Sequence, residues 1–205
     1  MEKSQTSPAS SAAERAFARY EQVVKPLLGQ VYRAGYAVAC GRKCSACCSE
    51  PAMCTRQEAV VMAEAFRALP AADQDQVRAA LRAWLERFDQ GGFGAMEIVG
   101  LYKYRAAKLP CPFLKDQECS IYAARPLCCR GHMALGPREN CEKDELRPDQ
   151  LYVMVDRVMH ECYAVMLEQE DIVLDHVGIW LSELILGEPR PSRARKGLKV
   201  TNRPA

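Results

Sequence analysis

Eleven cysteines in 205 residues, gathered mainly into two short blocks, constrain this chain more than any other feature. The blocks are Cys40-Gly-Arg-Lys-Cys44-Ser-Ala-Cys47-Cys48 and, much later, Cys111, Cys119, Cys128 and Cys129. Thiolates suit zinc and iron, and spacings of two or three residues let successive sulfur atoms converge on one metal. Two distant blocks can supply ligands to one centre, which then closes the loop between them. The pattern therefore predicts a fold organised around a metal site.

The cysteine content favours reduced thiols over disulfides. Cysteine makes up about 5% of the residues, below the roughly 8–10% of small disulfide-rich scaffolds, and the count is odd. The N-terminal segment has no apolar stretch typical of a signal peptide, and the apolar stretch 172–186 is interrupted by charged residues. We therefore expect a cytoplasmic protein with no membrane partner.

Apolar residues recur at helical spacing through most of the chain, whereas strand alternation is nearly absent. Thr55 followed by Glu58 is a capping-box signature, and Pro26 is expected to kink an N-terminal helix or to begin a new one. The other expected helices include an apolar stripe at 77–88 and the segments 95–109, 149–168 and 172–186. Residues 110–148 show little periodicity and are predicted to be irregular. The fold class is therefore predicted to be all-α, a single helical domain with an irregular cysteine-rich loop layer holding a metal site.

Composition divides the chain into three parts. We expect a disordered N-terminal segment at 1–11, a helical cysteine-cluster metal-binding domain at 12–187 and a basic disordered tail at 188–205. The net charge of +2 suggests no polyanionic partner. The basic tail has no aromatic residue to stack on bases, so no nucleic-acid partner is expected.

The adjacent cysteines raise a geometric question. In an extended chain Cys47 and Cys48 point to opposite sides, and the same holds for Cys128 and Cys129. Either two neighbouring metal centres share these pairs, or one member of each pair is a spare thiol. Basic residues inside or beside the blocks could balance the negative charge of a thiolate site: Arg42, Lys43, Arg125 and Arg130.

The remaining thiols and histidines have weaker signals. Cys162 falls in the apolar register of its helix, which favours a buried structural thiol, and His176 is interpreted as a histidine at the edge of the core. Cys54 could be an acidified thiol or an outer ligand. Cys141 is a candidate ligand in the irregular segment, and His132 is a candidate nitrogen ligand. Their roles stay open at this point.

The spacing Cys40-x3-Cys44-x2-Cys47 resembles the cluster motif of radical S-adenosylmethionine enzymes. That resemblance implies a βα-barrel and an aromatic residue before the last cysteine. Here that residue is Ala46, and the chain lacks strand–helix alternation. A radical enzyme is therefore not our interpretation.

A second resemblance covers residues 40–130. The runs Cys44-x2-Cys47-Cys48, Cys111-Pro-Phe-Leu, Cys119-x-Ile-Tyr and Arg125-Pro126-x2-Cys129-Arg130 resemble the YkgJ-type cysteine-cluster family, the CxxCxxCC zinc- or iron-chelating domain. The chain departs from this pattern in the three-residue spacing after Cys40 and in the additional Cys128. The resemblance implies chelation of an iron–sulfur cluster or Zn²⁺, with Cys129 as the ligand of the last motif. Family members are often labelled iron–sulfur oxidoreductases, and flagellin lysine N-methylases resemble the same domain.

The predicted metal ligands are Cys40, Cys44, Cys47, Cys48, Cys111, Cys119 and Cys129. The leading hypothesis is a metal-binding protein that chelates an iron–sulfur cluster or zinc through both blocks, with a redox role. The alternatives are an S-adenosylmethionine-dependent protein lysine methyltransferase and a structural zinc module without catalysis. Enzymatic activity is left open. The expected partners are the metal ion or cluster, together with a protein partner or protein substrate.

Overall fold

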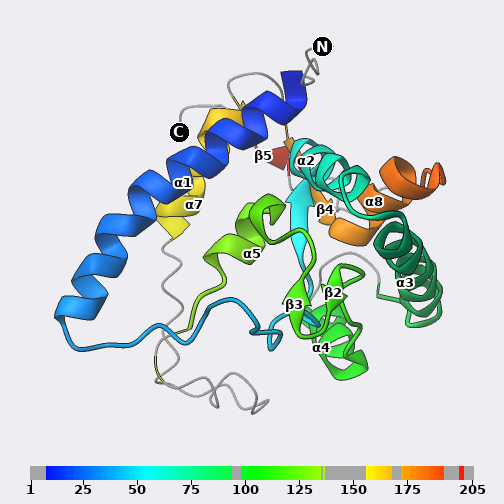
Figure 1. Ribbon diagram of the computed structural model, residues 1–205, viewed down its shortest axis with the longest axis horizontal. Helices are drawn as coiled ribbons and strands as arrows, with labels where there is room; N and C mark the ends of the chain where they lie inside the picture. The colour runs from blue at the N-terminus through cyan, green and yellow to red at the C-terminus, as the bar shows by residue number, and fades with distance from the viewer. Residues whose placement is uncertain are drawn as a thin grey trace.

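A computed structural model describes residues 8–93, 98–134, 136, 156–167, 172–191 and 199–200, and most of them are helical (Figure 1). In chain order the elements are α1 (Pro8–Arg33), β1 (Met53–Thr55), α2 (Arg56–Arg67), α3 (Ala71–Gln90), α4 (Ile98–Ala107), β2 (Leu114–Lys115), β3 (Glu118–Cys119), the 3₁₀ turn η1 (Tyr122–Ala124), α5 (Leu127–Gly131), α7 (Asp156–Leu167), β4 (Ile172–His176), α8 (Val177–Leu186) and β5 (Lys199–Val200). The mostly helical character is confirmed. The two small sheets are an addition to the all-α prediction.

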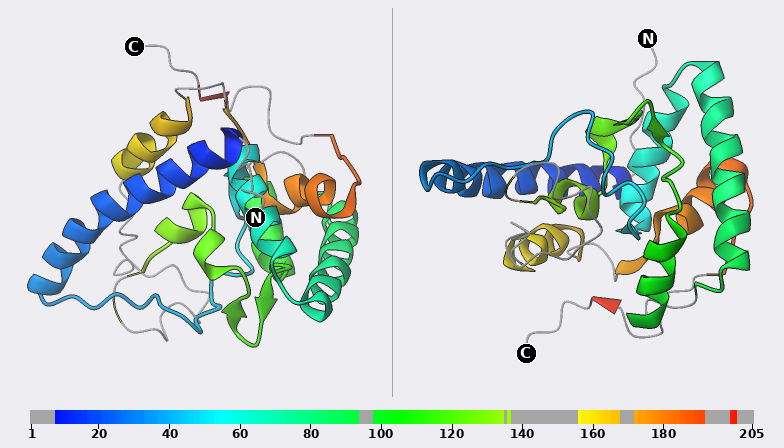
Figure 2. Two further views of the ribbon diagram at one scale, coloured as in Figure 1. Left: turned by 45° about the horizontal axis from the view of Figure 1, so that its top comes forward. Right: turned by 90° about the horizontal axis from the view of Figure 1, so that it is seen from below.

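The long helix α1 forms one side of the molecule, and α7 lies along it (Figures 1 and 2). The alanines at 12, 13 and 16 are completely buried, and such small side chains let neighbouring helices approach closely. The helix continues through Pro26, so of the two alternatives at that residue, a kink or a new helix, the new helix is wrong. It begins inside the segment 1–11, and β5 lies inside the segment 188–205. The division into domains stays a prediction.

Helices α2, α3 and α8 pack together on the other side of the molecule. The capping box at the start of α2 is confirmed, because the Thr55 side chain accepts from the Glu58 backbone N–H and the Glu58 carboxylate accepts from the Thr55 N–H. The apolar stripe of α3 is also confirmed, with its residues from Val77 to Phe88 buried at helical spacing. At the end of α8, Gly187 takes a φ of 71° in the left-handed region that favours glycine, which terminates the helix.

The sequence pattern predicted one helix over residues 172–186, but the structure divides this segment into a strand and a helix. Its first five residues form strand β4, and α8 begins only at Val177. Strand β4 is the centre of an antiparallel sheet with the order β1-β4-β5, in which Cys54 lies opposite Asp175. One pairing partner of β4 is β1, the strand that follows the first cysteine block. The sheet therefore attaches that block to the helical core.

The cysteine-rich segment after residue 110 is more regular than predicted where the structure describes it. Strands β2 and β3 form a hairpin with Leu114 opposite Cys119. Its two turn residues, Asp116 and Gln117, have φ values of 48° and 63°, which is the left-handed backbone of a type I′ turn. The 3₁₀ turn η1 and helix α5 follow. Beyond Gly136 the segment, including Cys141, lies outside the described residues.

A cluster of stacked rings fills the core between α3, α4 and β4. The Trp84 and Phe88 rings stack with centroids 4.6 Å apart, and the indole of Trp84 donates to the Tyr104 hydroxyl at 3.0 Å. The His176 ring stacks on Tyr104 at 5.3 Å. Rings arranged in this way contribute beyond the area they bury. Three of these rings, Trp84, Tyr104 and His176, also line the site described below.

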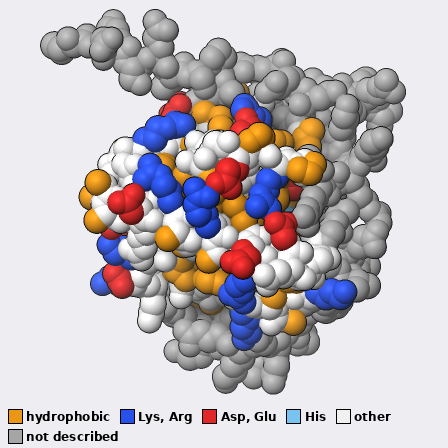
Figure 3. Space-filling view, turned by 90° about the vertical axis from the view of Figure 1, so that its right-hand side faces the viewer, with side chains coloured by type: hydrophobic (Ala, Val, Ile, Leu, Met, Phe, Trp, Pro, Cys, Tyr) orange, Lys and Arg blue, Asp and Glu red, His pale blue; other side chains and the backbone are white. Residues whose placement is uncertain are grey.

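The outer face over α3 and α8 carries basic and acidic side chains mixed together (Figure 3). Several of them are paired, such as Arg56 with Glu183 at 2.7 Å and Lys115 with Asp73 at 2.6 Å. Exposed pairs of this kind contribute little to stability. Among the described helices, none combines the length and apolar character needed to cross a membrane.

Candidate metal centre

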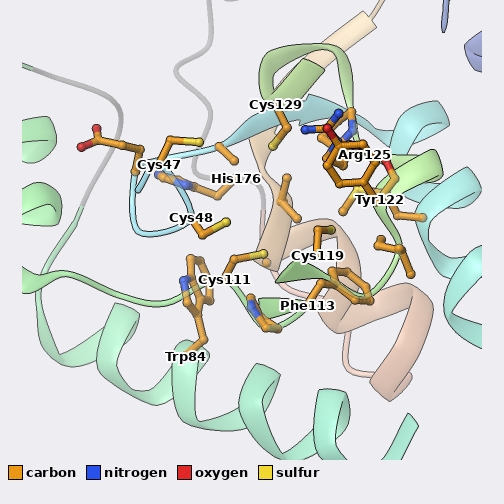
Figure 4. A pocket seen from close by; sticks show the side chains of 18 of the residues that line it. Cys47, Cys48, Trp84, Cys111, Phe113, Cys119, Tyr122, Arg125, Cys129 and His176 are labelled. Carbon is orange, nitrogen blue, oxygen red and sulfur yellow. Dashed lines mark hydrogen bonds between the residues drawn. The ribbon is translucent and has the colours of Figure 1, made fainter. Parts of the chain in front are cut away.

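A pocket of about 90 Å³ lies where the two cysteine blocks meet. Six cysteines line it: Cys44, Cys47, Cys48, Cys111, Cys119 and Cys129. Figure 4 shows the sulfur atoms of the five labelled cysteines facing a common space. A volume of this size exceeds the roughly 10–15 Å³ that one water molecule needs. The fold therefore gathers six of the seven predicted ligands around one pocket with room for a metal centre.

Tight turns in the first block present its thiols to the pocket. The Cys48 N–H donates to Ser45 O at 2.9 Å, and the Glu50 N–H donates to Cys47 O at 3.0 Å. Just before Cys44, Lys43 takes a left-handed φ of 61°, which reverses the chain. Because the segment turns and is not extended, the adjacent Cys47 and Cys48 both line the pocket.

One short backbone hydrogen bond joins the two blocks directly. The Cys111 N–H donates to Cys48 O at 2.7 Å. The hairpin then presents Cys119 from β3, and α5 presents Cys129. The second block thus brings three of its four thiols to the pocket, from a turn, a strand and a short helix.

The structure places Cys40 and Cys128 outside the lining of this pocket. The Cys40 sulfur accepts from the Ala134 N–H at 3.3 Å, and its thiol donates to the His132 carbonyl at 3.6 Å. Cys40 therefore links the start of the first block to the chain that follows α5. The Cys128 sulfur lies 3.9 Å from the Cys129 sulfur. Of this vicinal pair, only Cys129 lines the pocket.

The remaining candidates lie away from the pocket or outside the described residues. Cys54 is fully buried in β1, and Cys162 is fully buried in α7 as predicted for a structural thiol. His132 is half-buried and is not among the lining residues, and burial lowers its pKa. Cys141 cannot be placed because the structure does not describe that segment.

Cationic side chains lie close to the thiols. Lys43 and Arg125 line the pocket. The Arg125 guanidinium stacks over the Tyr122 ring at 3.5 Å and donates to the Tyr122 carbonyl at 3.1 Å. Arg130, with an 11% exposed side chain, donates to the Arg125 carbonyl at 2.7 Å. The predicted positive charge beside the cysteine blocks is thus present at the pocket itself.

Several of the pocket thiols, among them Cys111, Cys119 and Cys129, are costly to ionise without a cation. Burial raises the pKa of Cys111 and Cys119 above the ordinary value for a thiol. The hydrogen bond with Cys128, followed by burial, raises the pKa of Cys129. A bound metal favours the thiolate strongly enough to displace these protons. The donor set, soft sulfur in a partly buried pocket, fits zinc or iron.

The sequence pattern placed His176 at the edge of the core and did not indicate that it lines the site. This buried histidine lines the pocket together with Trp84, Tyr104 and Phe113. Met53 lies opposite His176 in the β1–β4 pairing, which brings the histidine beside the first cysteine block. No local pattern signals this position, because only pairing between strands far apart in sequence creates it.

The cysteines line one pocket, but lining a pocket is a weaker condition than coordinating a metal ion. Within the described ranges, no group of three or more His, Cys, Asp or Glu side chains has the arrangement needed to hold a metal ion. The sulfur atoms share a pocket without converging on one point.

A family model named CxxCxxCC, described as "Putative zinc- or iron-chelating domain", matches residues 39–152. The matched range contains both cysteine blocks and all the predicted ligands. No curated protein and no solved structure matches the chain. Because the match covers more than half of the chain, the protein belongs to the CxxCxxCC family of zinc- or iron-chelating domains.

Proposed function

We propose that the pocket holds an iron–sulfur cluster bound by thiolates from both cysteine blocks, and that the protein has a redox role. The observation that carries the proposal is the set of six cysteines lining one pocket. A structural zinc site uses four tetrahedral ligands drawn close to one ion. Six thiols spaced around a wider cavity suit a polynuclear centre better, with four as cluster ligands and the others as neighbours of the cluster.

The surroundings of the pocket support a shielded and anionic centre. When bound, the cluster would supply one-electron transfer. Trp84, Tyr104 and Phe113 contribute apolar walls to the pocket. Lys43 and Arg125 offset the negative charge of the thiolates. The protein would thus set the redox potential through burial and nearby charge, which are two of the main factors for such centres.

Metal analysis of anaerobically purified protein tests the identity of the centre. We expect near-stoichiometric iron with acid-labile sulfide and a brown colour in the visible spectrum. A colourless protein with stoichiometric zinc would overturn the cluster and leave a structural zinc module. If neither metal is bound, chelation by this pocket is refuted.

Cysteine variants test the assignment of the ligands. Cys111→Ser and Cys129→Ser should each lose metal, because each removes a thiolate from the pocket. Cys162→Ala is the matched control, since Cys162 is buried in α7 away from the pocket lining. It should keep the wild-type metal content. Full metal content in the Cys129 variant would remove that residue from the ligand set.

A further inference from the structure

One carboxylate, Glu58, is completely buried close to the metal pocket without lining it. Burying a charged group is costly unless its hydrogen-bonding capacity is met. Glu58 is the third residue of α2, where its role in the capping box of that helix accounts for only one of its oxygen atoms.

The two carboxylate oxygens of Glu58 bind different parts of the chain. Oε2 accepts from the Thr55 N–H at 2.8 Å and from the Thr55 hydroxyl at 3.0 Å. Oε1 accepts from the Leu127 N–H at 2.7 Å. Thr55 ends the strand that follows the first cysteine block, and Leu127 begins the short helix that carries Cys129. A single buried side chain therefore connects the strand that follows the first cysteine block to the helix that carries Cys129.

This connection requires a carboxylate. Both oxygens of an ionised carboxylate accept hydrogen bonds, whereas a glutamine amide offers one acceptor and one donor group. A glutamine at position 58 would place its NH₂ group against a backbone N–H on one side. Because the site is fully buried, no water could satisfy the group that is left unpaired.

We propose that Glu58 is a positioning residue for the metal centre. Its hydrogen bonds fix α5, and therefore Cys129, relative to the strand that follows the first cysteine block. This inference rests on the proposed function, because it assigns Cys129 to the metal. Residues that orient ligands in this way typically change metal affinity about 10–100-fold when they are mutated.

The test compares Glu58→Gln with Thr55→Ala in the metal-loaded protein. Both changes weaken the α2 cap, but Thr55→Ala leaves the bond between Oε1 and the Leu127 N–H in place. With an excess of chelator, we expect Glu58→Gln to lose metal at least about tenfold faster than wild type. Thr55→Ala should stay close to the wild-type rate. Equal rates for the two variants would overturn the positioning role.

A second measurement separates local displacement from unfolding and does not need the metal. In the metal-free protein, alkylation by iodoacetamide is followed at each cysteine by mass spectrometry. Glu58→Gln should accelerate modification of Cys129 while Cys111 reacts as in wild type. Equal acceleration at both cysteines would mean that Glu58 supports the whole domain and would overturn the proposal. A wild-type protein that binds no metal would refute the proposed function, while the alkylation result would still decide the role of Glu58.

Discussion

Replacing Gly178 with alanine should destabilise the protein, against the usual gain from removing a helical glycine. Gly178 is the second residue of α8, and it faces the Trp84 ring across the helix interface. A methyl group there would lie 2.2 Å from Cζ3, 2.5 Å from Cε3 and 2.7 Å from Cη2 of Trp84. These separations are well below a normal carbon–carbon contact of about 3.5–4.0 Å. Either the ring or the helix would have to move.

The Trp84 ring has little freedom to move. Its side chain is only 5% exposed, its indole N–H is bonded to the Tyr104 hydroxyl, and its ring stacks on Phe88. Overpacking of such a core costs about 1–3 kcal/mol. Gly178 does not adopt a left-handed φ, so its backbone conformation is open to alanine. Alanine lowers the conformational entropy of the unfolded chain, which stabilises the folded protein by about 0.4–1 kcal/mol. Taken at the middle of both ranges, the expected net loss is about 1.3 kcal/mol. Each kcal/mol lowers the melting temperature by roughly 2–4 °C in a chain of this size.

Urea unfolding followed by circular dichroism measures this change, and Gly29→Ala in α1 is the matched control. A methyl group at Gly29 meets only the end of the Arg33 side chain at 3.5 Å, an ordinary contact, so that variant should be slightly stabilised. In a Trp84→Phe background the penalty at Gly178 should shrink, because the outer indole atoms are gone. A Gly178→Ala protein as stable as wild type would refute the packing argument, and so would an undiminished penalty in the double variant.

Two further predictions concern buried groups near α1. Cys162→Ala should lower the free energy of unfolding by roughly 1 kcal/mol, because it removes one buried sulfur atom without touching the pocket. An unchanged urea midpoint would contradict the burial of Cys162. Burial raises the pKa of Tyr20 to about 12, and its hydroxyl donates to the Arg130 carbonyl at 2.8 Å. The unfolded chain loses this proton near pH 10, so the stability that comes from the protonated phenol is complete below pH 10 and is lost as the pH rises towards 12. Urea midpoints between pH 9 and 12 should therefore fall less steeply in Tyr20→Phe than in wild type, and parallel slopes would count against the assignment.

Elements whose stability comes from neighbours in sequence could be predicted. The stripe of α3 and the capping box at Thr55 depend on residues three to four positions apart, and the structure confirms both. Strand β4 could not be predicted in this way. Its residues continue the apolar pattern of α8, and they form a strand because they pair with β1 and β5.

The same division holds for the candidate site. Cysteine spacing pointed to a thiolate metal site, and the family match confirms the zinc- or iron-chelating domain. Spacing could not show that Cys47 and Cys48 both line the pocket while Cys128 does not, because that depends on whether the local backbone turns or extends.

The kind of chemistry could be predicted from the cysteine spacing, because soft thiol ligands in closely spaced blocks suit zinc or iron wherever they lie in a fold. Which thiols meet depends on the tertiary fold. Pairing of β1 with β4 brought His176 to the pocket, and the Cys111–Cys48 backbone bond joined the two blocks. The buried Glu58 carboxylate held α5 beside them. Each of these contacts links residues far apart in the chain, so its position follows from packing and hydrogen bonding across the whole domain, which no local pattern contains.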